Sequence, residues 1–206
     1  MAKQPRDHLV NVALKLFHQY GFHATGIDKI LAESGVAKNT LYRHFKSKDE
    51  LILASLRKQD EEFRNWLMRE VESRNNAVER LLAVFDVYEE WSRTPTFFGC
   101  MFINASAEFS DADSPIHAFC KEHKRLVTRY IQDLANNANI FASERLATYW
   151  VLLLDGAVIS TQVSSNSLSF QQAKAVAKNL LQLDVPILVG DSQDILAEHA
   201  SLTGAG

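Results

Sequence analysis

The stretch ATGIDKILAESGVAKNTLYRHFKSKDEL, residues 24–51, decides the fold. It is predicted to form two short helices joined by a tight turn, with a third helix directly behind them. The first helix is expected to open at Thr25, with Asp28 three residues later in a weak form of capping box. It should stop at Gly35, because glycine adopts the left-handed conformation without a Cβ clash. This arrangement is typical of a helix-turn-helix, whose second helix enters the DNA major groove.

The second helix, predicted over about 38–45, has an apolar back and a polar front. Leu41 and Phe45 should face inward. Cations on the front would neutralise phosphates, while Asn39 and Thr40 can read base edges and Tyr42 can meet a thymine methyl. The predicted DNA-binding residues are Thr25, Lys38, Asn39, Thr40, Tyr42, Arg43, His44 and Lys48. The alternative is a small three-helix domain with a solvated polar face.

The same region resembles the DNA-binding domain of the TetR family of bacterial transcriptional regulators. The resemblance is carried by Ala13, Phe17, Gly21, Phe22, Thr25, Ile30, Ala32, Gly35, Val36, Thr40, Leu41, Tyr42, His44, Phe45, Lys48 and Leu51. Its most specific part is LYRHFKSKDEL at 41–51. The resemblance implies a helix-turn-helix head on a helical body that binds a small-molecule effector and forms a homodimer.

Composition favours an all-α fold. The 206 residues are 47% hydrophobic and 23% charged, with only eight glycines and four prolines, as expected of a globular helical protein. The net charge of −3 hides an asymmetry, because residues 1–48 hold eight Lys/Arg against three Asp/Glu. A basic end on an acidic remainder suits a phosphate partner. We expect a DNA-binding domain at 1–48, a ligand-binding and dimerisation domain at 49–184, and a tail at 185–206.

Periodicity and punctuation predict helices throughout the chain. Their expected ranges are 5–20, 47–74, 77–92, 97–109, 115–137, 143–163 and 170–183, with one more short helix near 191–199. The expected N-terminal caps include a capping box at Ser47 and Glu50, Ser143, and a second box at Ser169 and Gln172.

Other sequence features limit the function. Two cysteines make no disulfide framework, and the start resembles no signal peptide. The apolar stretch 149–159 is short and contains Asp155, so we expect a cytoplasmic protein without a membrane partner. No H-E-x-x-H, nucleophile-elbow, P-loop or Rossmann motif occurs, so neither an enzyme nor a cofactor is predicted.

The last two long helices carry more apolar residues than one buried face needs, which indicates a homodimer with four helices at its interface. The predicted interface comprises Trp150, Leu153, Ala173, Val176, Ala177, Leu180 and Leu181. Ordinary monomer core is the alternative. A symmetric dimer would bind a near-palindromic operator.

The helices between about 60 and 155 are expected to enclose an effector pocket with aromatic walls. Its candidate residues are Phe63, Trp66, Phe85, Tyr88, Trp91, Met101, Asn104, Tyr130 and Trp150. Plain core packing is the alternative for each. Asn104 and Asp155 are polar residues in apolar surroundings, and each needs a ligand, a helix terminus or a dimer partner.

Two further sites are open alternatives. His117, Cys120 and His123 recur at a spacing of three, as metal ligands would, although a polar helix face is the favoured interpretation and no metal site is predicted. Cys100 and Cys120 could form a redox or electrophile switch, because cations flank Cys120, or they are small apolar filler.

The sequence predicts a ligand-responsive transcriptional repressor that binds a palindromic operator as a homodimer and is released by a small molecule. The alternatives are a redox-, electrophile- or metal-sensing regulator that uses Cys100 and Cys120, and a DNA-binding adaptor without small-molecule input.

Overall fold

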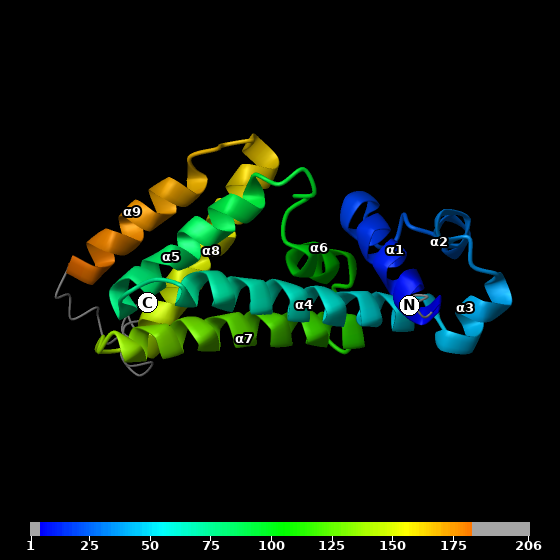
Figure 1. Cartoon of the computed structure of the whole chain (residues 1–206), viewed down its shortest axis with the longest axis horizontal. Helices are drawn as coiled ribbons and strands as arrows, with labels where there is room; N and C mark the ends of the chain where they lie inside the picture. The colour runs from blue at the N-terminus through cyan, green and yellow to red at the C-terminus, as the bar shows by residue number, and fades with distance from the viewer. Residues whose placement is uncertain (1–4, 183–206) are drawn as a thin grey trace, which may run out of the picture.

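A computed structural model describes residues 5–182. This part of the chain folds into nine helices, which confirms the all-α fold class. The head, at the right of Figure 1, consists of α1 (Pro5–Tyr20), α2 (Ile27–Ser34) and α3 (Lys38–His44). Next come α4 (Lys48–Glu72), α5 (Ala77–Ser92), α6 (Met101–Glu108), α7 (Pro115–Asn137), α8 (Ser143–Ser164) and α9 (Ser169–Gln182). The expected helix at 191–199 and the tail at 185–206 lie outside the described residues.

The head is held together by a stripe of α1 that is buried as its periodicity predicts. Leu9, Ala13 and Phe17 are buried, and they belong to the same apolar cluster as Ile30 of α2 and Leu41 of α3. Burial of each large apolar side chain contributes roughly 1.5–3 kcal/mol. Three short helices therefore share one core that none of them could bury alone.

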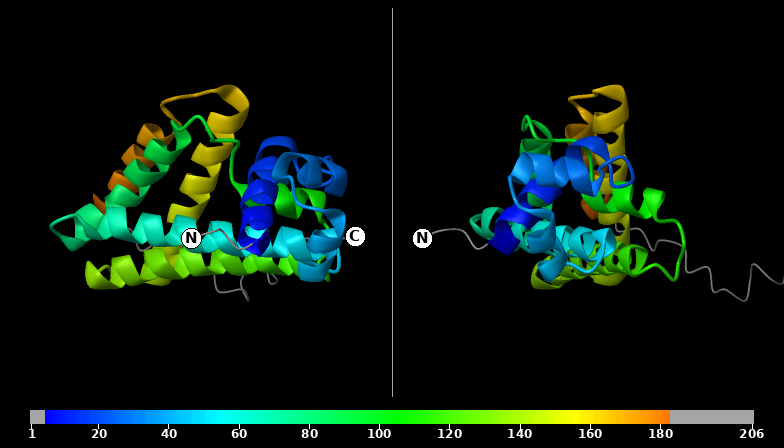
Figure 2. Two further views of the ribbon diagram at one scale, coloured as in Figure 1. Left: turned by 45° about the vertical axis from the view of Figure 1, so that its right-hand side comes forward. Right: turned by 90° about the vertical axis from the view of Figure 1, so that its right-hand side faces the viewer.

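The long helix α4 belongs to two cores. Leu51 and Leu56 in its first half pack into the head cluster, while Leu67 and Val71 in its second half pack into the body cluster. It runs beside α7 along the length of the molecule (Figures 1 and 2). A rigid helix that contributes to both cores connects the orientation of the head to the packing of the body.

The N-terminus of α4 has the predicted capping box. The hydroxyl of Ser47 accepts a hydrogen bond from the Glu50 amide at 3.2 Å. The Glu50 carboxylate returns to the chain but accepts from the Lys46 amide at 2.7 Å, one residue earlier than in the standard motif. These two hydrogen bonds fix the residue at which α4 begins.

Two predicted helix starts and one predicted cap are wrong. The helix α2, expected to open at Thr25, begins at Ile27, since the hydroxyl of Thr25 is used elsewhere and Gly26 caps the helix without a side-chain bond. The predicted helix 97–109 begins only at Met101, because Gly99 has a φ of +83° and breaks the turn before it. Ser143 is the first residue of α8 and does not cap it.

The start of α9 also differs from prediction. Ser169 is already helical, and Asn166 organises the preceding turn. The side-chain oxygen of Asn166 accepts a hydrogen bond from the Leu168 amide at 3.0 Å. The backbone carbonyl of Asn166 accepts one from the Ser169 hydroxyl at 3.0 Å. Asparagine commonly closes such turns with its own side chain.

In the body, α8 packs between α7 and α9, and α5 packs against α9 and α4. Of the described helices, α8 has the length and apolar composition that a membrane span would also need, and only 33% of its most apolar window is buried. Core helices pass the same test. Asp155 in the middle of α8 pairs with Lys124 of α7, which indicates a helix that belongs to the protein body.

Candidate nucleic-acid interface and effector cavity

The outward face of α3 is free to meet a partner in the described part of the chain. The side chains of Lys38, Asn39, Arg43 and His44 are exposed, and Tyr42 is 45% exposed. Leu41 is fully buried behind them, which fixes the helix by its apolar side. The polar front and apolar back are therefore separated as the sequence predicted.

Two neighbouring contacts shape this face. Thr40 is half-buried, and its hydroxyl accepts a hydrogen bond from the Arg43 guanidinium at 3.2 Å. The Lys48 ammonium donates to the carbonyl of His23 at 3.3 Å, so it bridges α4 to the turn between α1 and α2. Five side chains of α3 are thus exposed to solvent, and Lys48 lies at the edge of this face. The five are Lys38, Asn39, Tyr42, Arg43 and His44.

Thr25 does not belong to this surface, which corrects its prediction as a DNA contact through its side chain. It is completely buried. Its hydroxyl donates to the carbonyl of Gly21 at 2.7 Å and lies 3.2 Å from the carbonyl of Leu16. It therefore holds the turn between α1 and α2 by satisfying carbonyls at the end of α1.

The orientation of α2 and α3 is set by contacts with α1. A ring nitrogen of His8 lies 3.0 Å from the carbonyl of Ser34, at the end of α2. Gly35 follows with a φ of +65°, as predicted for a residue that ends the helix. The Arg6 guanidinium stacks over the ring of Phe45, 5.4 Å from its centre. These contacts present α3 as a fixed edge of the head.

Head and body meet at a junction whose residues carry no signal in the sequence. The carboxylate of Glu108, the last residue of α6, accepts from the backbone amides of Phe22 and His23 at 2.9 and 2.6 Å. His18 of α1 donates to the carbonyl of Gly99 at 3.0 Å. These partners lie more than 80 positions apart in the chain. No local pattern could have paired them, and only the fold brings them together.

Four predicted pocket residues do surround one cavity in the body. Phe63, Tyr88, Trp91 and Met101 line it together with His123 and others. Its volume is only about 20 Å³, which is room for about one water molecule. Phe63 meets Tyr88 and Trp91 edge to face, with centroids 5.3 and 5.2 Å apart. The aromatic walls are present, and in this conformation they close on one another.

The remaining predicted pocket residues lie elsewhere. Phe85 and Trp150 are core residues, and Trp66 packs against that core. The indole of Trp150 is fully buried and donates to the carbonyl of Leu81 at 3.1 Å. Asn104 donates to the carbonyl of Phe98 at 3.1 Å, so its partner is backbone. Tyr130 lines a separate cavity of about 150 Å³ between α4 and α7.

Beside the small cavity, α4 and α7 are joined by a buried polar cluster. The ring of His123 lies 2.7 Å from Asp60, which also accepts two hydrogen bonds from Arg64 at 2.8 Å. Burial opposes the charge of Asp60, but the hydrogen bonds from His123 and Arg64 outweigh it and lower its pKa to about 2. Burial lowers the pKa of His123 despite Asp60, so its neutral Nδ1–H donates to the carboxylate.

The alternative in which Cys120 is a reactive thiol is not supported. Burial raises the pKa of its thiol to about 12, which outweighs the nearby Lys124. His117 contacts the carbonyl of Phe109 at 2.9 Å, whereas His123 contacts Asp60, so the two rings serve different partners. Among residues 5–182 no cluster of three His, Cys, Asp or Glu side chains is suited to a metal ion. Cys100 is a free, half-buried thiol.

The predicted dimer residues divide into two groups. Trp150, Ala173 and Ala177 are buried within the protomer, which corrects their assignment to a surface. Val176 is 47% exposed, and Leu153, Leu180 and Leu181 are half-buried against the core. An exposed apolar stripe follows α8 instead. Its members are Leu152, Ile159 and Val163, which are 65%, 45% and 78% exposed.

The fold and the exposed α3 face define a helix-turn-helix DNA-binding protein with a helical regulatory body. Residues 9–55 match the family model described as bacterial regulatory proteins, tetR family, and residues 77–176 match the one described as tetracyclin repressor-like, C-terminal domain. The chain belongs to the TetR family, and it is a transcriptional regulator.

Individual relatives cover most of the chain. The crystal structure of SCO4454, a TetR-family transcriptional regulator from Streptomyces coelicolor, is similar with a TM-score of 0.83 and 30% identity, over 88% of this chain and 90% of that one. The Escherichia coli repressor NemR is 25% identical over 185 residues, or 85% of this chain and 93% of NemR. The regulator YjdC of the same organism is 22% identical over 180 residues, or 86% and 93% of the two chains.

Proposed function

We propose that this protein is a homodimeric, ligand-responsive repressor that binds a near-palindromic operator. The observation that carries the proposal is the exposed front of α3, in which cations, an amide and an aromatic ring stand on a buried apolar back. The repressor NemR, which is similar over 85% of this chain, supports repression. Such a regulator acts on DNA in the cytoplasm, catalyses no reaction and needs no cofactor.

The side chains of α3 would divide the work of DNA recognition. Cations position a protein on phosphates, and amides, hydroxyls and rings read base edges or the thymine methyl. The proposed phosphate contacts are Lys38, Arg43, His44 and Lys48, and the proposed base contacts are Asn39, Thr40 and Tyr42. Thr25 acts only by holding the turn before α2.

Binding to duplexes selected from a random library tests this division, with fluorescence anisotropy measured over a range of salt concentrations. Lys38→Ala should weaken binding to all sequences and reduce the salt slope by about 1, whereas Tyr42→Ala should cost about 1–3 kcal/mol on the selected site. Lys178→Ala, a matched exposed lysine on α9, should change neither. If both α3 variants bound like the unchanged protein, α3 would not be the recognition helix.

The dimer would form through α8 and α9. Leu152, Ile159 and Val163 recur along one face of α8, and Gly156 between them is exposed with open space around it. A small residue within an apolar stripe lets a second helix approach closely. Contiguous apolar surface on a globular protein marks a contact site. Val176 of α9 adds to the proposed surface.

Effector response would require the aromatic cavity to open. A ligand that fits between Phe63, Tyr88 and Trp91 binds only the opened state, and this differential affinity shifts the population. Because α4 contributes to both cores, rearrangement around Phe63 would reorient the head. Release of operator DNA by an apolar aromatic compound, abolished by Trp91→Ala, would support this assignment.

A second candidate is a DNA-binding regulator without small-molecule input. The closed state of the cavity, with about 20 Å³ of free volume, favours it. The two candidates differ in one observation, because only the sensor binds a compound in competition with DNA. A redox sensor would have to use Cys100, which lines the same cavity, since the Cys120 thiol is held protonated.

A further inference from the structure

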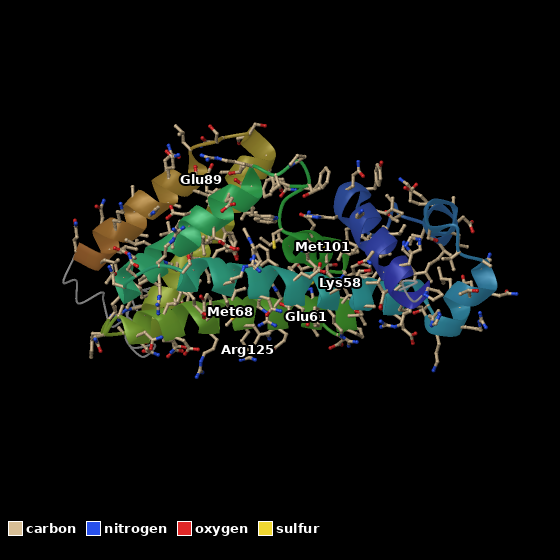
Figure 3. The ribbon with its side chains drawn as sticks, viewed as in Figure 1. Lys58, Glu61, Met68, Glu89, Met101 and Arg125 are labelled. Atoms are coloured by element: carbon tan, nitrogen blue, oxygen red, sulfur yellow. The ribbon has the colours of Figure 1, made fainter. Side chains whose placement is uncertain are left out.

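An open cleft of about 500 Å³ separates the head from the body. It is far larger than the aromatic cavity of the body. Its walls come from the end of α1, the loop after α5, α6 and the end of α8. Figure 1 labels these helices. Met101, labelled in Figure 3, marks the start of α6 at this junction. The volume suits a small organic molecule.

Three helices present their C-terminal ends to this cleft. His18 and Gln19 lie in the last turn of α1, Glu108 is the last residue of α6, and Gln162 lies in the last turn of α8. The final carbonyls of a helix lack partners within the helix and carry a partial negative charge equivalent to about half an electron. Convergence of three such ends favours a positive group in the cleft, and Thr25 at the end of α1 and the ring of His23 at the end of α6 already bond some of these carbonyls.

The side chains add to this preference for a positive group. Glu108 is the only acidic residue among the residues that line the cleft, and these include no lysine or arginine. Among the described residues, its carboxylate makes no ion pair and instead accepts the amides of Phe22 and His23. Its charge is therefore fixed in place, and no side-chain cation neutralises it within residues 5–182.

Rings and neutral polar groups form the rest of the wall. Phe97 and Phe98 line the cleft and are half-buried. His18 meets Phe98 edge to face at 5.6 Å. Since His18 donates through Nε2 to the carbonyl of Gly99, its Nδ1 is left as an acceptor. Aromatic faces, acceptors and a fixed carboxylate attract cations.

We propose that this cleft is a binding site for an organic cation, namely a protonated or quaternary amine with an apolar portion. The positive group would lie near Glu108 and the helix ends, and the apolar portion against Phe97 and Phe98. The ligand would contact α1 of the head together with α6 and α8 of the body. The proposal does not depend on the function proposed above, because it concerns binding to the protein alone.

The test titrates the whole protein, without DNA, with benzyltrimethylammonium and follows backbone amide shifts by NMR. Benzyl alcohol and benzenesulfonate serve as neutral and anionic probes with the same ring. We expect saturable shifts at Gly21, Asn104 and Gln162 with the cation, at a dissociation constant of about 1 mM or below for a molecule of this size. The neutral and anionic probes should leave these three amides unshifted.

Two variants change the charge of the cleft. Gln19→Lys adds a cation at an exposed position, and it should weaken binding of benzyltrimethylammonium roughly three- to tenfold, as expected for a like charge about 6 Å away. Glu108→Gln should weaken it to a similar degree. Asn65→Lys adds the same charge to an exposed position on α4 outside the cleft, and should have no effect.

Gln19→Lys keeps the contacts between Glu108 and the head, so the proposal can be refuted even if Glu108→Gln fails to fold. Equal affinity of the unchanged protein and Gln19→Lys would overturn it. It would also be overturned if benzyl alcohol bound as tightly as the cation, or if the cation shifted only residues around Trp91. Failure to bind or release operator DNA would bear on the proposed function alone.

Discussion

Replacement of Thr25 by valine should destabilise the head and leave its DNA surface intact. Valine has the shape of threonine without the hydroxyl, and Thr25 is fully buried, so the change removes one hydrogen bond and little else. The carbonyl of Gly21, 2.7 Å from the hydroxyl, loses its partner. An unpaired buried acceptor costs roughly 1–3 kcal/mol, and the partial exposure of Gly21 and the added buried methyl offset part of that. A net loss of about 1–2 kcal/mol is expected.

The assay combines thermal denaturation with operator binding well below the transition. For a chain of this size, the loss corresponds to a decrease in Tm of roughly 2–8 °C. Operator affinity of the folded Thr25→Val protein should stay within about twofold. Thr40→Val provides the matched comparison, because that hydroxyl lies on the α3 face, and it should weaken binding with little change in Tm.

A Thr25→Val protein with unchanged Tm and weakened operator binding would refute this reasoning. It would show that the hydroxyl contacts DNA and that the head rearranges to expose it. The sequence-based assignment of Thr25 to the DNA surface would then stand.

Three other predictions follow from the structure. Leu152→Glu should convert the proposed dimer to a monomer in sedimentation experiments, whereas Val78→Glu, at an exposed apolar position on α5, should not. A stable Leu152→Glu dimer would place the interface elsewhere. Below pH 6.5 the unfolded chain binds a proton at His123 more readily than the native protein does, because burial lowers the pKa of the native His123. Below about pH 5 the same holds for Asp60, whose pKa is lowered to about 2 in the native protein. The free energy of unfolding in urea should therefore decrease as the pH is lowered. Asp60 should account for a decrease of about 2 kcal/mol between pH 5 and pH 2, and Asp60→Asn should remove most of that decrease. Iodoacetamide at pH 8 should alkylate Cys120 only in the unfolded protein, and rapid native labelling would contradict its buried, protonated state.

Local chemistry made the head predictable from sequence. Gly35 ends α2 because the backbone at this position is left-handed, a conformation that glycine adopts without a Cβ clash. Ser47 and Glu50 fix the start of α4 through hydrogen bonds that span no more than four residues. Apolar spacing identified the buried side of α1 for the same reason, since a helix places residues three and four apart on one face. The all-α fold was recoverable from these signals, whereas the family was indicated by the resemblance of the stretch LYRHFKSKDEL at 41–51.

Contacts between distant segments were not predictable in this way. Periodicity identifies an apolar helix face but does not say whether its own chain or a second copy covers it, so Trp150 and Ala177 were assigned to a surface and lie in the core. Aromatic composition predicted a pocket, while only packing set its volume.

The sequence alone therefore determined the helices, the helix-turn-helix and the residues that face outward from α3. The tertiary structure decided that Thr25 is buried and that Glu108 holds the turn between head and body. It also decided that three helix ends meet in one cleft. The physical reason is range: capping and amphipathic spacing act over a few residues, whereas burial and electrostatic potential depend on segments that only folding brings together.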